Sequence, residues 1–286
     1  RSLFLLLLLA ALLAPDSHAQ SSRTVSRTFD LAPDGTVALD SYKGRIEVTT
    51  WAKDRAEITV RIQGEKQSLV ENTKIRFASS PRELTIETDY DDVEDEQKLF
   101  GLFRLGSINR PSTDYTLRIP RTANLSIDTY SATTSVTSLA GDLRFDAYSA
   151  DLTVDQLTGT LRADTYSGTT HVKRAEGTIS ADTYSGNLQA DSLSGRVTFS
   201  TYSGSAALNF TALTGDCRFD SFSGDVTITL PSTAGAVIVT EENALDTDLP
   251  IRIGQHGDDR IRGTIGDGGP RLRFDTFSGT LSIQAR

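Results

Sequence analysis

The sequence predicts an all-β protein, a β-solenoid of stacked coils of about 18 residues, with two strands in each coil and parallel sheets. Three observations predict this fold. Tyrosines recur every 18 residues over much of the chain, glycines mark a turn every nine residues, and apolar residues alternate with polar ones between the turns. A strand that alternates in this way directs one face inward. Two such strands per coil therefore form two parallel sheets that face each other across a thin core.

The repeat has two halves that differ at the turn. One half ends in an aromatic residue followed by Ser-Gly or a close variant, and the other ends in leucine or alanine nine residues later. Between turns, inward positions are mostly apolar, as in Leu143 and Phe145 or Leu188 and Ala190. One coil contains too few apolar side chains to offset the entropy of ordering its backbone, so stability must come from the stacked array.

The aromatic residues are interpreted as structural corners that pack inward. The reason is that their counterparts nine residues on include Leu139, Leu157 and Leu193. On this interpretation Tyr166→Phe is nearly neutral, and Tyr166→Ala costs about 3 to 5 kcal/mol by opening a cavity. The alternative is a stacked aromatic platform for a ligand. The corner residues are Tyr42, Tyr130, Tyr148, Tyr166, Tyr184, Tyr202, Phe222 and Phe277.

An aspartate stands two residues before most of these aromatic residues, and an arginine often stands two residues before the aspartate. This pattern predicts ladders of opposite charge on one outward face. A calcium-stabilised repeat protein is the alternative, because calcium-binding nonapeptide rolls also use two nine-residue halves. Their paired-glycine motif is absent here. We therefore expect no bound metal and no cofactor. The aspartates are Asp128, Asp146, Asp164, Asp182, Asp220 and Asp275, and the arginines are Arg144, Arg162, Arg218 and Arg273.

Residues 1–19 have the features of a secretory signal peptide: a basic first residue, an apolar run and a small-x-small site at Ser17-His18-Ala19. The apolar run is too short to cross a bilayer as a helix, and we expect no transmembrane anchor. The predicted location is therefore exported, either periplasmic or extracellular at the cell surface. The single cysteine, Cys217, excludes an internal disulfide.

Two regions follow the signal peptide. Residues 20–120 are predicted to form an N-terminal β region, with a first coil, capping strands at 58–62, 84–88 and 115–119, and an insertion at 89–114. Residues 121–286 are predicted to form the repeat solenoid, with an insertion at 231–270. The first insertion carries an apolar cluster that either caps the stack or forms a partner loop. This cluster comprises Leu99, Phe100, Leu102, Phe103 and Leu105.

The outward positions of the second face are mostly neutral, and hydroxyls and amides there suit hydrogen bonding to a polysaccharide or a protein. The alternative is a solvated wall. This candidate ligand face comprises Thr133, Ser135, Thr153, Thr169, His171, Asn187, Gln189, Ser205 and Thr227. No catalytic residues are predicted, because metal-ligand spacing, a nucleophile elbow and a phosphate loop are all absent from the sequence. The net charge of -9 argues against nucleic acid.

The segment "GTVALDSYKGRIEVTTW" (35–51) and the recurring "DTYSG" or "DTFSG" coils carry a resemblance to a known family. The chain resembles the bacterial "putative adhesin" domains of unknown function. The resemblance implies a β-solenoid domain of an exported or membrane-attached envelope protein, and it implies no catalytic residues. The expected function is non-enzymatic: an adhesin-like or scaffold protein that presents an extended face to a polysaccharide or envelope protein. The alternative is a carbohydrate-active lyase or hydrolase on a β-helix. The oligomeric state is not predicted.

Overall fold

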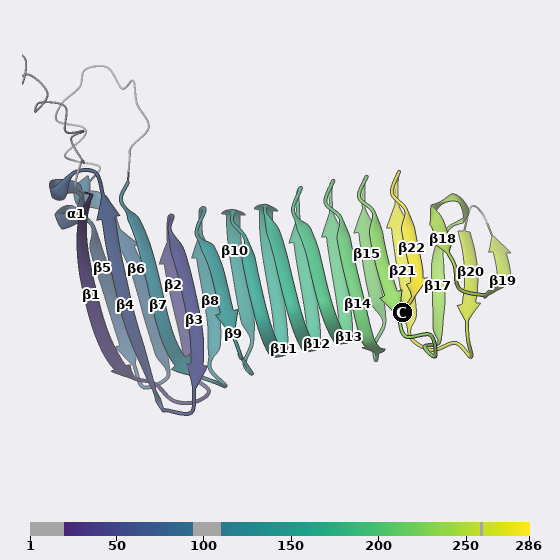
Figure 1. The fold of residues 1–286 in the computed structure, drawn as a ribbon, viewed down its shortest axis with the longest axis horizontal. Coiled ribbons are helices and arrows are strands. Elements are labelled where there is room, and N and C mark those ends of the chain that lie inside the picture. The colour runs from purple at the N-terminus through teal and green to yellow at the C-terminus, as the bar shows by residue number, and fades with distance from the viewer. Residues whose placement is uncertain (1–19, 94–109, 258–259) are drawn as a thin grey trace, which may run out of the picture.

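The computed structural model describes residues 20–93, 110–257 and 260–286. These residues form an elongated stack of strands lying side by side along the long axis (Figure 1). Apart from the short helix α1 (Gln67–Asn72), the single turn η1 (Glu242–Ala244) and helical residues at 91–93, the elements of the described residues are strands. The all-β class expected from the sequence is confirmed.

The centre of the stack consists of parallel strands whose paired residues lie 18 apart in the sequence. In what we call the first sheet, Leu143 is paired with Leu161; in the second sheet, Thr153 is paired with His171. β8 (Asn124–Thr129) and β10 (Leu143–Ser149) lie in the first sheet, and β9 (Thr133–Thr137) lies in the second. Three long strands pass from the second sheet into the first: β11 (Leu152–Ser167), β12 (Thr169–Thr183) and β13 (Asn187–Thr201).

At the N-terminal end, the coil formed by β2 (Thr36–Ser41) and β3 (Arg45–Trp51) lies directly on β8 and β9. β6 (Glu83–Asp89) and β7 (Ser112–Pro120) add one parallel layer to this coil. Antiparallel strands then end the stack: β5 (Lys74–Ser80) on β6, β4 (Arg55–Gly64) on β7, and β1 (Ser21–Asp30) on β4. The strands expected at 58–62, 84–88 and 115–119 lie in β4, β6 and β7.

At the other end, the last repeat copy is inserted into the stack. β14 (Ala206–Leu213) and the pair β15 (Cys217–Ser221) and β16 (Val226–Leu230) continue the centre. β21 (Arg271–Thr276) and β22 (Leu281–Ala285) pair directly with β15 and β16. The residues between them lie beyond: β17 (Ala236–Glu241) on β21, β18 (Leu245–Thr247) on β22, then the antiparallel β20 (Arg260–Ile265) and β19 (Ile251–Gly257).

The alternating apolar positions meet in one core between the two sheets. Phe145, Phe199, Phe219 and Phe274 are fully buried in the first sheet and are the largest side chains there. Smaller residues such as Ala163 lie at the same position in other coils. The core volume per coil therefore varies while the backbone register is kept.

The glycine columns are required by the close approach of successive coils. Gly177 has a φ of +144°, and a Cβ there would lie 2.2 Å from the carbonyl oxygen of Gly159 in the preceding coil. Any side chain at this position would push two hydrogen-bonded coils apart.

Candidate functional site

Eight aromatic rings form one continuous ladder along the stack. Adjacent rings have centroids 4.8–5.0 Å apart and planes within 3–9° of parallel. This separation equals the spacing of strands in a sheet. The ladder comprises Tyr42, Tyr130, Tyr148, Tyr166, Tyr184, Tyr202, Phe222 and Phe277.

The prediction that these corner residues pack inward is wrong. The exposed fraction is 44–49% for the rings from Tyr130 to Phe222, and 78% for Phe277. Tyr42 is partly buried, whereas Leu139, Leu157 and Leu193 at the opposite corner are buried. The two corners therefore point their hydrophobic residues in opposite directions.

Strand alternation explains the outward direction of the rings. Leu125, Ile127 and Thr129 point inward, so Tyr130 points outward. At the opposite corner Ser138 has a φ of 60°, and this break in the strand brings Leu139 inward.

The serine or threonine immediately before the ring points inward, and its hydroxyl holds the turn that follows the ring. Thr183 Oγ1 accepts a hydrogen bond of 2.7 Å from the backbone N–H of Gly186, and Thr201 and Gly204 repeat the contact. Ser221 and Thr276 make the same bond to the glycine three residues later. The hydroxyl in Thr-Tyr-Ser-Gly therefore caps the turn.

The N-terminal end of the ladder is closed by side chains. Tyr90 packs edge-on against Tyr42, with ring centroids 6.2 Å apart, and the Arg110 guanidinium lies 4.3 Å from the Tyr42 ring centroid. The Tyr90 hydroxyl donates to the carbonyl of Pro111, and burial raises the pKa of Tyr90 to about 12. This phenol is therefore neutral at physiological pH.

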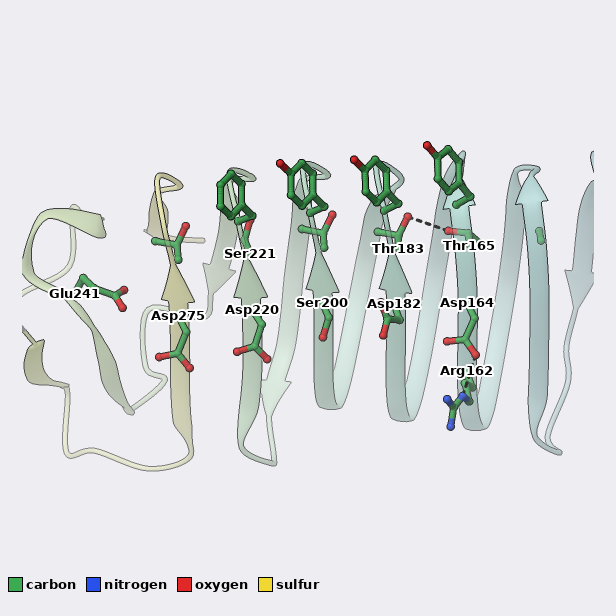
Figure 2. Close-up of a pocket in the computed structure, with 17 residues that line it drawn as sticks. Arg162, Asp164, Thr165, Asp182, Thr183, Ser200, Asp220, Ser221, Glu241 and Asp275 are labelled. Atoms are coloured by element: carbon green, nitrogen blue, oxygen red, sulfur yellow. Dashed lines mark hydrogen bonds and ion pairs between the residues drawn. The ribbon is translucent and has the colours of Figure 1, made fainter.

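Beside the rings, carboxylates lie in register on successive strands of the first sheet. Strand register aligns one aspartate with the next, in the order Asp128, Asp146, Asp164 and Asp182. Ser200 takes the next position, and the column resumes with Asp220 and Asp275. Asp40 and Glu87 extend this carboxylate ladder toward the N-terminal end. Figure 2 shows the carboxylates of Asp164, Asp182, Asp220 and Asp275 in a row, with Glu241 beside Asp275.

Each arginine predicted to balance the ladder pairs with the aspartate two residues later on the same strand. The N–O distances are 2.7 Å for Arg144–Asp146, 3.1 Å for Arg162–Asp164, 2.6 Å for Arg218–Asp220 and 2.6 Å for Arg273–Asp275. Two residues before Asp128 and Asp182 the chain has serine instead of arginine. Neither aspartate has an ion pair within the part of the chain that the structure describes.

The two ends of the ladder differ in electrostatics. Partial burial, with repulsion from Asp128 and Glu87, raises the pKa of Asp40. Burial acts in the same direction on Asp275, but the hydrogen bond and charge of Arg273, with the charges of Arg260 and Arg218, outweigh it and lower the pKa. The negative charge of the ladder is therefore least compensated toward its N-terminal end.

A shallow groove runs along the line where rings, hydroxyls and carboxylates meet. One section has a volume of about 1090 Å³ and extends from Ala147 to Thr276. A second section of about 640 Å³ continues toward Asp40 and Tyr42, and both sections share Ala147 and Asp164. Figure 2 shows Thr165, Thr183 and Ser221 between the carboxylates and the rings.

The groove offers hydrogen-bonding groups and ring edges, not ring faces. Each interior ring is covered on both faces by its neighbours, so a sugar ring cannot stack on it. A ligand in the groove meets carboxylate oxygens along one side and the edges of the rings along the other. Such an arrangement suits an extended molecule rich in hydrogen-bond donors.

The family model named Toastrack DUF4097 matches residues 38–284. The chain belongs to the Toastrack DUF4097 family. The match includes the ladder and the groove, and it leaves out β1 and the first residues of β2. No curated protein matches the chain.

Among solved structures, a putative adhesin from Bacteroides fragilis is similar, with a TM-score of 0.50, 12% identity, and coverage of 92% of this chain and 97% of that chain. A putative adhesin from Parabacteroides merdae has a TM-score of 0.37, 10% identity, and coverage of 92% and 95%. A putative cell adhesion protein from Clostridium sporogenes has a TM-score of 0.21, 11% identity, and coverage of 92% and 100%. The first of these supports the Toastrack fold.

The family description indicates no enzymatic function. No group of three or more His, Cys, Asp or Glu side chains that could hold a metal ion occurs among the described residues. Over the same residues, no helix is long and apolar enough to cross a membrane.

The residues of the predicted neutral face lie on the second sheet, away from the groove. Register brings them into two columns; Thr169 is paired with Asn187, and His171 with Gln189. His171 Nε2 lies 2.8 Å from Asp191 Oδ2, and Asn187 Oδ1 accepts from the backbone N–H of Ser205. Thr133, Ser135, Thr153 and Thr227 occupy the same columns. The predicted partner loop, from Leu99 to Leu105, lies outside the described residues.

Proposed function

We propose that this Toastrack protein is an exported, non-enzymatic β-solenoid of 18-residue coils that binds an extended polymer of the cell envelope along the groove beside the aromatic ladder. The polymer is a polysaccharide or a strand of an envelope protein. The observation that carries the proposal is the repetition of one groove lining, rung after rung, at the spacing of strands in a sheet.

Repetition supports a polymeric ligand. A single rung contributes a carboxylate and a ring edge, which is too little for a specific small-molecule site. A polymer makes the same weak contact on several rungs, and linked contacts combine into an avidity far above that of one. The groove is also shallow and long, unlike the enclosed pocket that a small substrate needs.

The charge of the groove favours a ligand that donates hydrogen bonds. Asp182 and Asp128 have no ion pair in the described structure, and Asp40 is repelled by Asp128 and Glu87. Hydroxyls of a neutral polysaccharide, or amide and ammonium groups of a protein, donate to such oxygens. An anionic polymer is disfavoured because the ladder would repel it.

A matched pair of variants tests the groove. Ser200 and Gln189 both point outward from β13, but Ser200 lies in the groove and Gln189 lies on the neutral face. Ser200→Lys places an ammonium group between Asp182 and Asp220 and blocks the groove. Gln189→Lys makes the same change in charge on the other sheet.

Binding is measured by co-sedimentation with insoluble cell-wall polysaccharide and by capture of envelope proteins on immobilised chain. We expect Ser200→Lys to abolish the interaction and Gln189→Lys to leave it intact. The reverse result would assign binding to the neutral face that includes Thr169 and Asn187. If circular dichroism shows that both variants are folded and both still bind, neither the groove nor the neutral face is the binding surface.

A further inference from the structure

The aromatic ladder is closed at one end and open at the other. The Tyr42 end is covered by Tyr90 and Arg110. At the other end, Phe277 stacks on Phe222 through one face, with ring centroids 4.9 Å apart, and its side chain is 78% exposed. In the described chain, no further ring is stacked on its second face.

The stack itself continues beyond Phe277, but without a ring. β17 and β18 extend the two sheets past β21 and β22. They are joined through the three residues of η1, whereas residues 277–280 join β21 to β22. The connection through η1 is shorter and carries no aromatic residue, so the position of the next ring in the ladder is unfilled.

A pocket of about 410 Å³ occupies this position, next to the end of the groove. It is lined by Phe277 and Ser278 on one side and by Glu241, Asn243 and Ala244 on the other. Its size lies at the lower end of the range for ligand pockets. Glu241 Oε1 lies 3.9 Å from Arg260 Nη2, whereas Glu241 Oε2 is buried and has no hydrogen-bond partner among the described residues, so a carboxylate oxygen that can accept stands at the edge of the pocket.

The backbone at this rung also lacks a partner that the other rungs have. The residue after each ring donates its N–H to the carbonyl of the preceding ring residue: Ser185 to Tyr166 at 2.9 Å, and Ser278 to Phe222 at 3.1 Å. In the described part of the chain, no N–H donates to the carbonyl of Phe277. A free ring face and a free carbonyl therefore lie together.

We propose that this open end binds an aromatic side chain carried by an extended segment of a partner protein. The ring of the segment stacks on Phe277 as the next rung, and the following backbone N–H donates to the carbonyl of Phe277. Glu241 and the net charge of -9 favour a segment with a basic residue beside the aromatic one. This site adjoins the end of the groove and shares Glu241 and Thr276 with it, but neither proposal depends on the other.

The probe is the peptide acetyl-Tyr-Ser-Lys-amide, added at millimolar concentration to the full isotope-labelled chain. We expect NMR shift changes at Phe277, Asn243 and Thr280. Replacing the tyrosine of the peptide by alanine removes the stacked ring, and N-methylation of its serine removes the donor. Each change weakens binding by about threefold to tenfold, as expected for one stacking contact or one hydrogen bond.

Phe277→Ala is the matched variant of the protein, and Phe277→Tyr is its control. The exposure of Phe277 makes both compatible with folding. We expect the alanine variant to lose the shifts and the tyrosine variant to keep them. Unchanged shifts in Phe277→Ala, no shifts with the tyrosine peptide, or equal shifts with the alanine peptide would overturn the proposal. A methyl glycoside that binds this pocket more tightly than the peptide would also overturn it.

Discussion

Tyr166 is held mainly by two neighbouring rings. Its centroid lies 5.0 Å from that of Tyr148 and 4.9 Å from that of Tyr184, and 47% of the side chain is exposed. Because an exposed ring leaves no closed cavity when truncated, Tyr166→Ala should cost about 1 to 3 kcal/mol, the value of two stacking contacts. Tyr166→Phe keeps both contacts and should be neutral. Urea denaturation measures both, and a loss near 5 kcal/mol for alanine would indicate a buried ring.

The buried hydroxyl beside each ring should matter as much as the ring. Thr183→Val leaves the N–H of Gly186 without its acceptor and should cost about 1 to 3 kcal/mol. Thr183→Ser should recover most of this, because Ser221 makes the same bond in its own coil. The measurement is again the free energy of unfolding. Equal stability of the valine and serine variants would contradict the capping role.

The direction of the rings was predictable from one residue earlier in the motif. Strict alternation from Leu125 through Ile127 places Thr129 inside and Tyr130 outside. The inference that Tyr130 points inward, because Leu139 lies at the matching corner, failed because the backbone differs at the two corners. In the sequence, only the threonine or serine before each ring indicates this difference. The inward core positions, in contrast, followed correctly from alternation alone.

At the scale of the element, the two ends of the carboxylate ladder should respond oppositely to the same substitution. The pKa of Asp275 is lower in the folded chain than the value of 3.8 expected for the unfolded chain. The charge of Asp275 therefore stabilises the fold at pH values above 3.8, and this stabilisation is lost as the pH falls through the folded-state pKa. Asp275→Asn should therefore lower the melting temperature at pH 7 and have little effect near pH 2.

Asp40 has a raised pKa, so its charging costs stability as the pH rises above 3.8. Asp40→Asn should raise the melting temperature at pH 7, with the gain vanishing in acid. Thermal melts of both variants between pH 2 and pH 8 provide the comparison. If both substitutions changed the melting temperature at pH 7 in the same direction, the two ends of the ladder would not differ in electrostatics.

The charge ladder also predicts the response to metal removal. Four of its aspartates have an arginine on the same strand within 3.1 Å, so the carboxylates need no bound cation for neutralisation. The melting temperature should be unchanged by a chelator or by millimolar calcium. A rise with calcium would favour a metal site between the rungs that lack arginine, near Asp128 or Asp182.

The ends of the stack were less predictable than its centre. Periodicity located the coils because each repeats the same turn chemistry. It did not show that residues 231–270 lie beyond the last repeat copy, because β21 returns to β15 across 55 residues of sequence. Pairing between distant segments depends on which edge is open, and local pattern carries no such information.

For the whole molecule, the stack predicts which deletions are tolerated. Removing residues 169–186 joins Gly168 to Asn187 and deletes one coil, leaving each remaining column in register. Because stability in a repeat array is roughly a sum over neighbours, the shortened chain should fold and lose only a modest share of its stability.

Removing residues 178–186 deletes half a coil and aligns aromatic corners with leucine corners in every later coil. This chain should fail to fold cooperatively. Circular dichroism and thermal melting of the two deletions distinguish the cases; equal stability would mean that the repeating unit is nine residues, not eighteen.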